Sequence, residues 1–295
     1  MLKNNIYELI GNTPLVRSRS LVTKPGVRLF FKMEGHNPGG SVKDRPALNM
    51  IKSALDRGEI DQSSKLIEAT SGNTGIALAM IAGLFNLDME LVMPENATRE
   101  RVQTMRAFGA KVTLTSSEVG IEGSRDYAEA KVQNEGYVML NQFGNPDNWK
   151  AHFKTTGPEI WKDTEQEVTH FVSAMGTTGT IMGVSTYLKE QNPSIQIIGA
   201  QPTDGSSIPG IRKWPEEYLP AIFDRSRVDR IEEVSQEQAR EMTKRLAREE
   251  GIFAGMSSGG SATVATRIAN ELDSGTVVCI ICDRGDRYLS SDLFD

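Results

Sequence analysis

Cysteine and histidine are both rare in this 295-residue chain, which has two cysteines and three histidines. Two cysteines cannot build the disulfide scaffold of a small secreted protein, and they fit a reducing compartment. Cys279 and Cys282 have the C-x-x-C spacing of redox and zinc motifs. They lie in an apolar run that predicts a strand, however, on which positions three apart point to opposite faces. Because the histidines are also far apart in the sequence, at positions 36, 152 and 170, we predict no metal site.

Long apolar runs are missing as well. No window is apolar enough to span a bilayer, and residues 1–11 lack the apolar segment and the cleavage site of a secretory signal. A formal charge of −6 and a pI near 5.3 disfavour nucleic acid and anionic membranes as partners. The sequence therefore predicts a cytoplasmic protein in which any anion-binding site is local.

What the chain does contain is a regular alternation of strand and helix patterns. Apolar strand patterns occur at 27–33, 65–69, 91–93, 111–115, 137–140, 170–175, 197–198 and 276–282, and helical patterns lie between most of them. This alternation predicts an α/β fold whose mostly parallel sheets are covered by helices and bind ligands at the carboxyl ends of their strands. Residues 201–220 form a long Gly/Pro-rich loop without periodicity.

The length of the chain predicts two domains, because it exceeds what one small core needs. The Gly/Asn/Pro cluster at 144–148 is the expected crossover. It separates an N-terminal α/β domain, residues 1–147, from a C-terminal α/β domain, residues 148–295. Residues 1–36 can pack on the second domain, and the active site is expected in the cleft between the two.

One lysine follows a Gly-rich bend in the segment 37–45. Behind it, apolar residues recur at helical spacing and stop at Gly58, so Lys43 is expected in or just before the first turn of a helix. The partial positive charge at a helix N-terminus disfavours an ammonium group and favours the neutral amine, which attacks carbonyls. Lys43 is thus a candidate Schiff-base lysine, with an ordinary surface lysine as the alternative.

Three turns rich in glycine and hydroxyls adjoin helix starts. After an apolar strand, one such turn offers backbone amides and hydroxyls to a single phosphate group, through Gly176, Thr177, Thr178, Gly179 and Thr180. No P-loop lysine follows and the G-x-G-x-x-G spacing is absent, which disfavours nucleotides. Residues 70–75 can clamp a carboxylate without a fixed cation, and residues 255–260 form the third turn. Helix capping is the alternative for each.

Together these stretches resemble the cysteine synthases, the O-acetylserine sulfhydrylases among the fold type II pyridoxal phosphate enzymes. The resemblance covers nearly the whole chain. In the family order it includes residues 10–15, the lysine loop, the turn at 70–75, the region of Gln142, the turn at 176–180 and residues 255–259. Residues 208–215 and 282–288 are similar to the cysteine synthase B subgroup.

The resemblance implies a cofactor, a reaction and a set of site residues. Lys43 would hold pyridoxal 5′-phosphate, Asn73 would bind its 3′ oxygen, Ser257 would face its ring nitrogen, and residues 176–180 would bind its phosphate. The substrate carboxylate would be held by Thr70, Ser71, Thr74 and Gln142. A homodimer of this kind makes L-cysteine from O-acetyl-L-serine and sulfide, and the B subgroup also uses thiosulfate, giving S-sulfocysteine. Arg212 and Lys213 offer positive charge for that anion.

Other functions share parts of this pattern. Cystathionine β-synthases usually carry extra regulatory sequence, for which this chain has no room, and serine/threonine dehydratases have a different lysine motif. A non-enzymatic module could use residues 176–180 to sense a phosphorylated metabolite. Gly39 and Gly40 replace the less flexible residues that are usual before the lysine, which predicts a looser loop.

Overall fold

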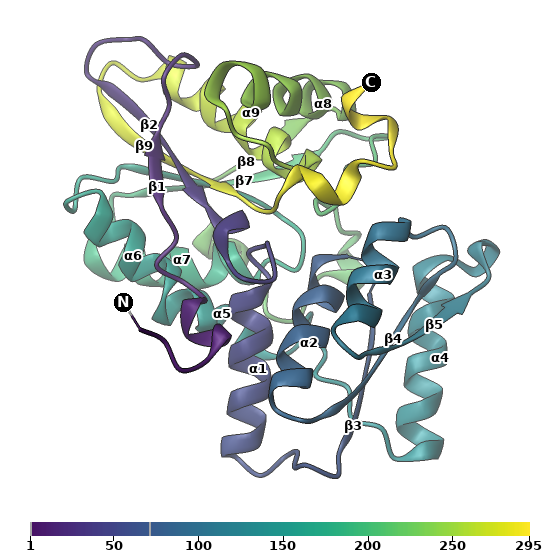
Figure 1. Ribbon diagram of the computed structural model, residues 1–295. Helices are drawn as coiled ribbons and strands as arrows, with labels where there is room; N and C mark the ends of the chain where they lie inside the picture. Colours follow the sequence, from purple (N-terminus) through teal and green to yellow (C-terminus); the bar gives the residue numbers. More distant parts are fainter. Residues whose placement is uncertain (1, 71) are drawn as a thin grey trace.

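The computed structural model describes residues 2–70 and 72–295 and contains two sheets. One has six strands in the order β1-β2-β9-β6-β7-β8, and the other has three in the order β3-β4-β5 (Figure 1). In the described part of the chain, β1 and β2 pair antiparallel and the other pairs of neighbouring strands are parallel. The predicted α/β class with mostly parallel sheets is confirmed.

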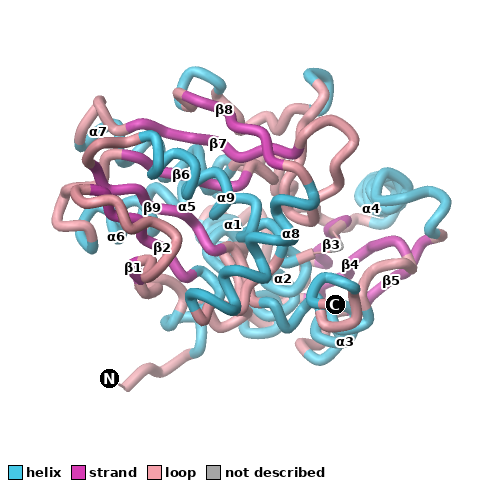
Figure 2. The backbone as a smooth tube through the Cα atoms, turned by 90° about the horizontal axis from the view of Figure 1, so that it is seen from above, coloured by secondary structure: helices cyan, strands magenta, loops and turns pink. Residues whose placement is uncertain are grey.

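The six-stranded sheet joins the two ends of the chain. Its strands are β1 (Leu15–Arg17), β2 (Val27–Met33), β6 (His170–Ala174), β7 (Gln196–Pro202), β8 (Arg230–Val234) and β9 (Gly275–Ile281). Helices α5 (Pro146–Lys154), α6 (Thr156–Asp163) and α7 (Gly179–Gln191) cover one face, and α8 (Gln236–Arg245) and α9 (Met256–Glu271) cover the other (Figure 2). β2 lies beside β9, with Phe31 opposite Cys279 in the register.

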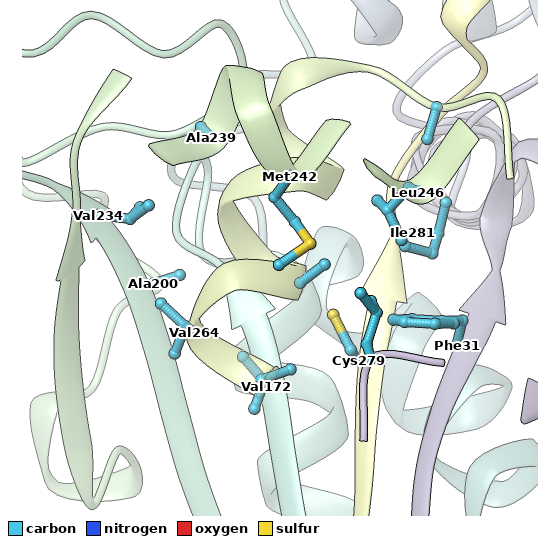
Figure 3. Close-up of a cluster of buried hydrophobic side chains, with 14 of the residues drawn as sticks. Phe31, Val172, Ala200, Val234, Ala239, Met242, Leu246, Val264, Cys279 and Ile281 are labelled. Atoms are coloured by element: carbon cyan, nitrogen blue, oxygen red, sulfur yellow. The ribbon is translucent and has the colours of Figure 1, made fainter. Parts of the chain in front are cut away.

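Apolar side chains between this sheet and α8 and α9 form the largest core cluster. Figure 3 shows Phe31, Val172 and Cys279 from the strands facing Met242 and Val264 from the helices. Cys282, just beyond β9, packs instead with the cluster on the opposite face of the sheet. The predicted divergence of the two cysteine side chains is therefore confirmed, and both thiols are free.

The three-stranded sheet contains β3 (Lys65–Ala69), β4 (Asp88–Pro94) and β5 (Lys111–Thr115). Helices α1 (Asp44–Asp56), α2 (Asn73–Leu84) and α3 (Arg99–Ala107) form one core cluster with it, and α4 (Gly120–Glu135) covers the other face. Nearly all of α2 is buried, and it contains no ionisable residue. The turn at 70–75 thus leads into a buried helix without charged side chains.

Several predicted boundaries were wrong. The strand expected at 137–140 is only an isolated parallel bridge between Leu66 and Val138. A helix, α5, begins within the expected crossover, where Asn145 caps Pro146 and the following residues. The last helix begins at Met256 rather than near Ser261. The capping box of Ser235 and Gln238 at the start of α8 is confirmed.

The six-stranded sheet takes β1 and β2 from before residue 36 and its other strands from after residue 169. The domain boundary at 147 stays a prediction. Among the described residues, no helix combines the length and the apolar character needed to cross a membrane.

Candidate active site

A cleft of about 1090 Å³ opens where the strand ends of the two sheets approach each other. Most of the predicted site residues line it: Lys43, Thr70, Asn73, Thr74, Gln142, Gly176, Thr177, Thr178, Thr180, Arg212 and Ser257. Gly179 begins α7 and packs against Asn148, while Ser71 lies outside the described residues. Residues that are more than 200 positions apart in the sequence therefore meet in one cavity.

Lys43 is the N-cap residue of α1, which confirms the prediction that it lies in or just before the first turn of a helix. Its loop is joined to the end of β9, because the Val42 N–H donates to the carbonyl oxygen of Cys282 at 2.8 Å. Burial lowers the pKa of Lys43, and the charges of Asp283 and Glu34 oppose this shift. Desolvation, rather than the helix terminus alone, thus favours the uncharged amine that nucleophilic chemistry needs.

The turn at 176–180 connects β6 to α7 and presents hydroxyls to the cleft. Thr178 has a left-handed backbone (φ +68°), and its buried Oγ1 has no hydrogen-bond partner among the described residues. The two neighbouring hydroxyls are held, Thr177 Oγ1 by Asn148 Nδ2 (3.3 Å) and Thr180 Oγ1 by His152 Nε2 (3.3 Å). A buried hydroxyl without a partner is unfavourable, so this turn is suited to an oxygen-rich anion such as a phosphate.

Glycine is required at both ends of this turn. A Cβ at Gly176 would lie 2.7 Å from the carbonyl oxygen of Gly210, and one at Gly179 would overlap the carboxamide of Asn148. Burial lowers the pKa of His152, behind the turn, to about 3. Its imidazole is therefore neutral and adds no fixed charge to the site.

A second group of polar residues gathers across the cleft. Thr74 Oγ1 donates to Gln142 Oε1 at 2.7 Å, and the Gly72 N–H donates to Thr70 Oγ1 at 3.4 Å. Asn73 begins α2, and its carboxamide is held at both ends, by Asp283 Oδ2 (2.7 Å) and by the guanidinium of Arg287. The threonine hydroxyls and the two carboxamides of this group are uncharged hydrogen-bonding side chains. Such side chains suit a ligand that carries a carboxylate.

Ser257 reaches the cleft from the first turn of α9. Unlike the turns at 70–75 and 176–180, its segment does not directly follow a strand. An isolated bridge between Ala254 and Arg284 brings it to the end of β9 instead. Burial raises the pKa of the neighbouring Cys282 to about 11, so this thiol is protonated at neutral pH.

Arg212 and Lys213 lie on the long loop after β7 but differ in their partners. Lys213 also lines the cleft, and its Nζ pairs with Asp204 (2.7 Å) and Glu233 (2.8 Å), so its role toward an anion stays a prediction. Arg212 stacks on Trp214, with 5.1 Å between its Cζ and the ring centroid. Trp214 in turn donates to the carbonyl oxygen of Gly176 at 2.7 Å.

The sequence missed Arg125 of α4, which also lines the cleft. Its Cζ lies 5.7 Å from the ring centroid of Phe143, and Phe143 packs edge-on against Trp214. A lone arginine on an amphipathic helix carries no sequence signal for such a place. No group of three or more His, Cys, Asp or Glu residues within 2–70 and 72–295 is placed to hold a metal ion.

Comparisons with known proteins agree with this geometry. The family model described as "Pyridoxal-phosphate dependent enzyme" matches residues 6–283. Cysteine synthase B of Pseudomonas aeruginosa is 57% identical over 98% of this chain and 97% of its own length. A crystal structure of cysteine synthase from Entamoeba histolytica has 37% identity and a TM-score of 0.94, covering 100% of this chain and 91% of that one.

A further solved structure belongs to an enzyme named for a different activity. The O-acetylserine dependent cystathionine beta-synthase from Helicobacter pylori has 34% identity and a TM-score of 0.91, with all of both chains covered. The family model matches well over half of the chain, and the identity to cysteine synthase B exceeds what a shared fold alone would give. The chain therefore belongs to the pyridoxal-phosphate dependent enzymes and, among them, to the cysteine synthases.

Proposed function

We propose that the chain makes L-cysteine from O-acetyl-L-serine and sulfide with pyridoxal 5′-phosphate as cofactor. One observation carries the proposal. A half-buried lysine whose pKa is lowered by desolvation, an unpaired buried hydroxyl at a helix start, and the Thr74–Gln142 pair line the same cleft. These three features fit, in turn, an aldehyde, a phosphate and an amino-acid carboxylate.

The cofactor would be held by residues from both sheets. Lys43 would bind its aldehyde carbon, Asn73 its 3′ oxygen, and residues 176–180 its phosphate. Ser257 would face the ring nitrogen, and a hydroxyl there does not force that nitrogen to stay protonated. When bound, the cofactor supplies an electron sink for the α-carbon of an amino acid.

The chain's own residues would orient the substrate and move its proton. Thr70, Ser71, Thr74 and Gln142 would hold the carboxylate by hydrogen bonds alone, which leaves the substrate's amino group free to react. Lys43 Nζ, once free, would take the proton from the α-carbon as the C–O bond to acetate breaks. It would return that proton after sulfur has bonded to the β-carbon.

We further propose thiosulfate as an alternative sulfur donor, giving S-sulfocysteine. The support is Arg212, which lines the cleft and has no carboxylate within ion-pair distance among the described residues. A homodimer and a cytoplasmic location are proposed from the resemblance and the composition, and so are domains at 1–147 and 148–295.

The test is a product assay on the purified protein. We expect L-cysteine from O-acetyl-L-serine with sulfide at a rate well above that of cystathionine from homocysteine, with either O-acetyl-L-serine or L-serine as the partner. Cystathionine as the main product would instead support a cystathionine β-synthase. Keto-acid release from serine or threonine would support a dehydratase.

The cofactor gives a second readout that separates an enzyme from a metabolite sensor. The purified protein should absorb visible light, and Lys43→Ala should remove or shift that band and abolish turnover. Lys65→Ala, which changes an exposed lysine at the start of β3, is the matched control. A colourless wild-type protein would support the phosphate-sensing alternative.

A further inference from the structure

We propose that Glu68 is a positioning residue for the substrate carboxylate and that it makes substrate binding depend on its ionisation. The inference rests on the proposed function, in which Thr70, Thr74 and Gln142 hold the substrate carboxylate. Glu68 would act through these residues. Glu68 itself is buried (3% exposed) and does not line the cleft.

Glu68 joins the two segments of the carboxylate site. It lies on β3 two residues before Thr70, which begins the hydroxyl-rich turn. Its carboxylate accepts hydrogen bonds from two successive backbone groups of the other segment, Asn141 N–H (3.2 Å) and Gln142 N–H (3.4 Å). The left-handed backbone of Asn141 (φ +55°) turns both N–H groups toward the same side chain.

Gln142 is consequently held at three points. Its N–H donates to Glu68, its carbonyl oxygen accepts from Asn148 Nδ2 (2.7 Å), and its side-chain oxygen accepts from Thr74 (2.7 Å). Because Gln142 is only 4% exposed, its N–H has little access to water if Glu68 stops accepting. Loss of this acceptor should therefore move the Gln142 side chain relative to Thr74.

The charges around Glu68 are few. Burial raises the pKa of Glu68 to about 7, against the hydrogen bonds from Gln142 and Asn141 and the charge of Arg125 on α4. Helix α2 has no ionisable residue, and neither has the segment from Asn141 to Pro146. Glu90 of β4 pairs in register with Ile67, so it lies on the face of the sheet opposite Glu68.

Ionisation of Glu68 therefore changes how well it can hold Gln142. Above pH 7 both carboxylate oxygens accept, one from each N–H. Below pH 7 the acid carries a proton on one oxygen, and that oxygen is a weaker acceptor for the nearby N–H than a carboxylate oxygen is. We infer that O-acetyl-L-serine binds more tightly to the ionised form, while the later addition of sulfur does not depend on Glu68.

Glu68→Gln tests this, because glutamine imitates the protonated acid in shape and charge. At pH 8 the variant holoenzyme should have a KM for O-acetyl-L-serine about tenfold higher than the wild type, with kcat and the KM for sulfide little changed. The ratio of the two kcat/KM values for O-acetyl-L-serine should fall from about ten at pH 8 toward one at pH 6. The effects of other groups that titrate in both proteins cancel in this ratio of kcat/KM values.

The matched control is Glu90→Gln, which changes a buried carboxylate on the next strand that binds Thr113 and Tyr137. It should leave the KM for O-acetyl-L-serine and its pH dependence unchanged. Because burial already favours neutral Glu68, E68Q is expected to fold. If E68Q does not fold, the wild-type protein gives a second test. Its affinity for L-serine, measured from the cofactor absorption, should increase as the pH rises through 7.

Two results would overturn the role of Glu68 in an active enzyme. One is a pH-independent ratio between wild type and E68Q, and the other is an equal loss in kcat and kcat/KM. A wild-type protein that makes no cysteine would instead refute the proposed function, so the two failures are distinguishable.

Discussion

Arg287 joins the lysine loop to Asn73: its guanidinium donates to the carbonyl oxygen of Gly39 and to Oδ1 of Asn73. Asp44 holds the other side of Gly39 by accepting its N–H at 2.5 Å. A Cβ at Gly39 would lie 2.6 Å from Asp44 Oδ1, and one at Gly40 would lie 2.5 Å from Arg287 Nη2. The two glycines thus admit the side chains of Asp44 and Arg287, which hold the loop, and the predicted looser loop stays a prediction.

Arg287→Lys should weaken cofactor binding. Lysine carries a single ammonium group and cannot reproduce the fork that contacts Gly39 and Asn73 together, so both the loop and the Asn73 carboxamide lose a restraint. We expect the affinity of the apoprotein for pyridoxal 5′-phosphate to fall roughly tenfold, measured by fluorescence titration. Arg284→Lys is the control, because Arg284 is exposed and its ion pair within the described residues is with Asp286. Equal affinities in the two variants would contradict the role of Arg287.

Gly40→Ala should destabilise the protein more than Gly58→Ala. Both glycines have left-handed backbones (φ +80° and +69°), so alanine is strained at each by about 1 kcal/mol. Only Gly40 also meets a side chain, that of Arg287, whereas a Cβ at Gly58 has nothing within 4 Å. Overpacking adds about 1–3 kcal/mol at Gly40, which urea unfolding would detect. Equal losses would mean that Arg287 moves aside freely.

Local features of the fold and of the site could be predicted from the sequence. The place of Lys43 at a helix start followed from apolar spacing behind a Gly-rich bend, and the capping box of Ser235 and Gln238 is complete within four residues. Such features depend on neighbours in the sequence, where propensity and periodicity act.

Features that depend on distant pairings could not be predicted in this way. The contact of Arg287 with Gly39 joins residues 248 positions apart, and β2 lies beside β9 only because the sheet brings the two ends of the chain together. Arg125 and Lys213 show the same limit: both line the cleft, but no sequence signal marked Arg125, and Lys213 pairs with Asp204 and Glu233. Charge in the sequence does not reveal which partner a side chain finds after folding.

Glu159 should make the fold sensitive to acid. It binds Arg45 (2.7 Å) and Lys32 (2.9 Å), linking α6 to α1 and β2. Burial raises its pKa, but the hydrogen bonds and charge of Arg45 and the charge of Lys32 lower it to about 2. A lowered folded-state pKa gives stability that is present above about pH 4.5 and is lost as the pH falls toward 2.

Glu159→Gln should therefore lower the free energy of unfolding at pH 7 by about 3 kcal/mol and reduce its dependence on pH between 5 and 2. Chemical denaturation across this range would measure both. Glu249→Gln is the control, since Glu249 pairs with Arg245 at the surface and its loss should matter much less. A variant as acid-sensitive as the wild type would show that other carboxylates govern acid unfolding.

Arg212→Ala should separate the two proposed sulfur donors. Thiosulfate carries two negative charges, whereas sulfide is small and carries at most one near neutral pH, so losing a cleft guanidinium should weaken thiosulfate more. We expect kcat/KM for thiosulfate to fall about tenfold while that for sulfide changes less than twofold. Lys213→Ala removes a neighbouring cation that Asp204 and Glu233 already pair, so it should affect thiosulfate far less. If Arg212→Ala lowers kcat/KM equally for both donors, the charge of Arg212 is not the cause. The defect would then come from the lost stacking of Arg212 on Trp214, which shapes the loop over Gly176.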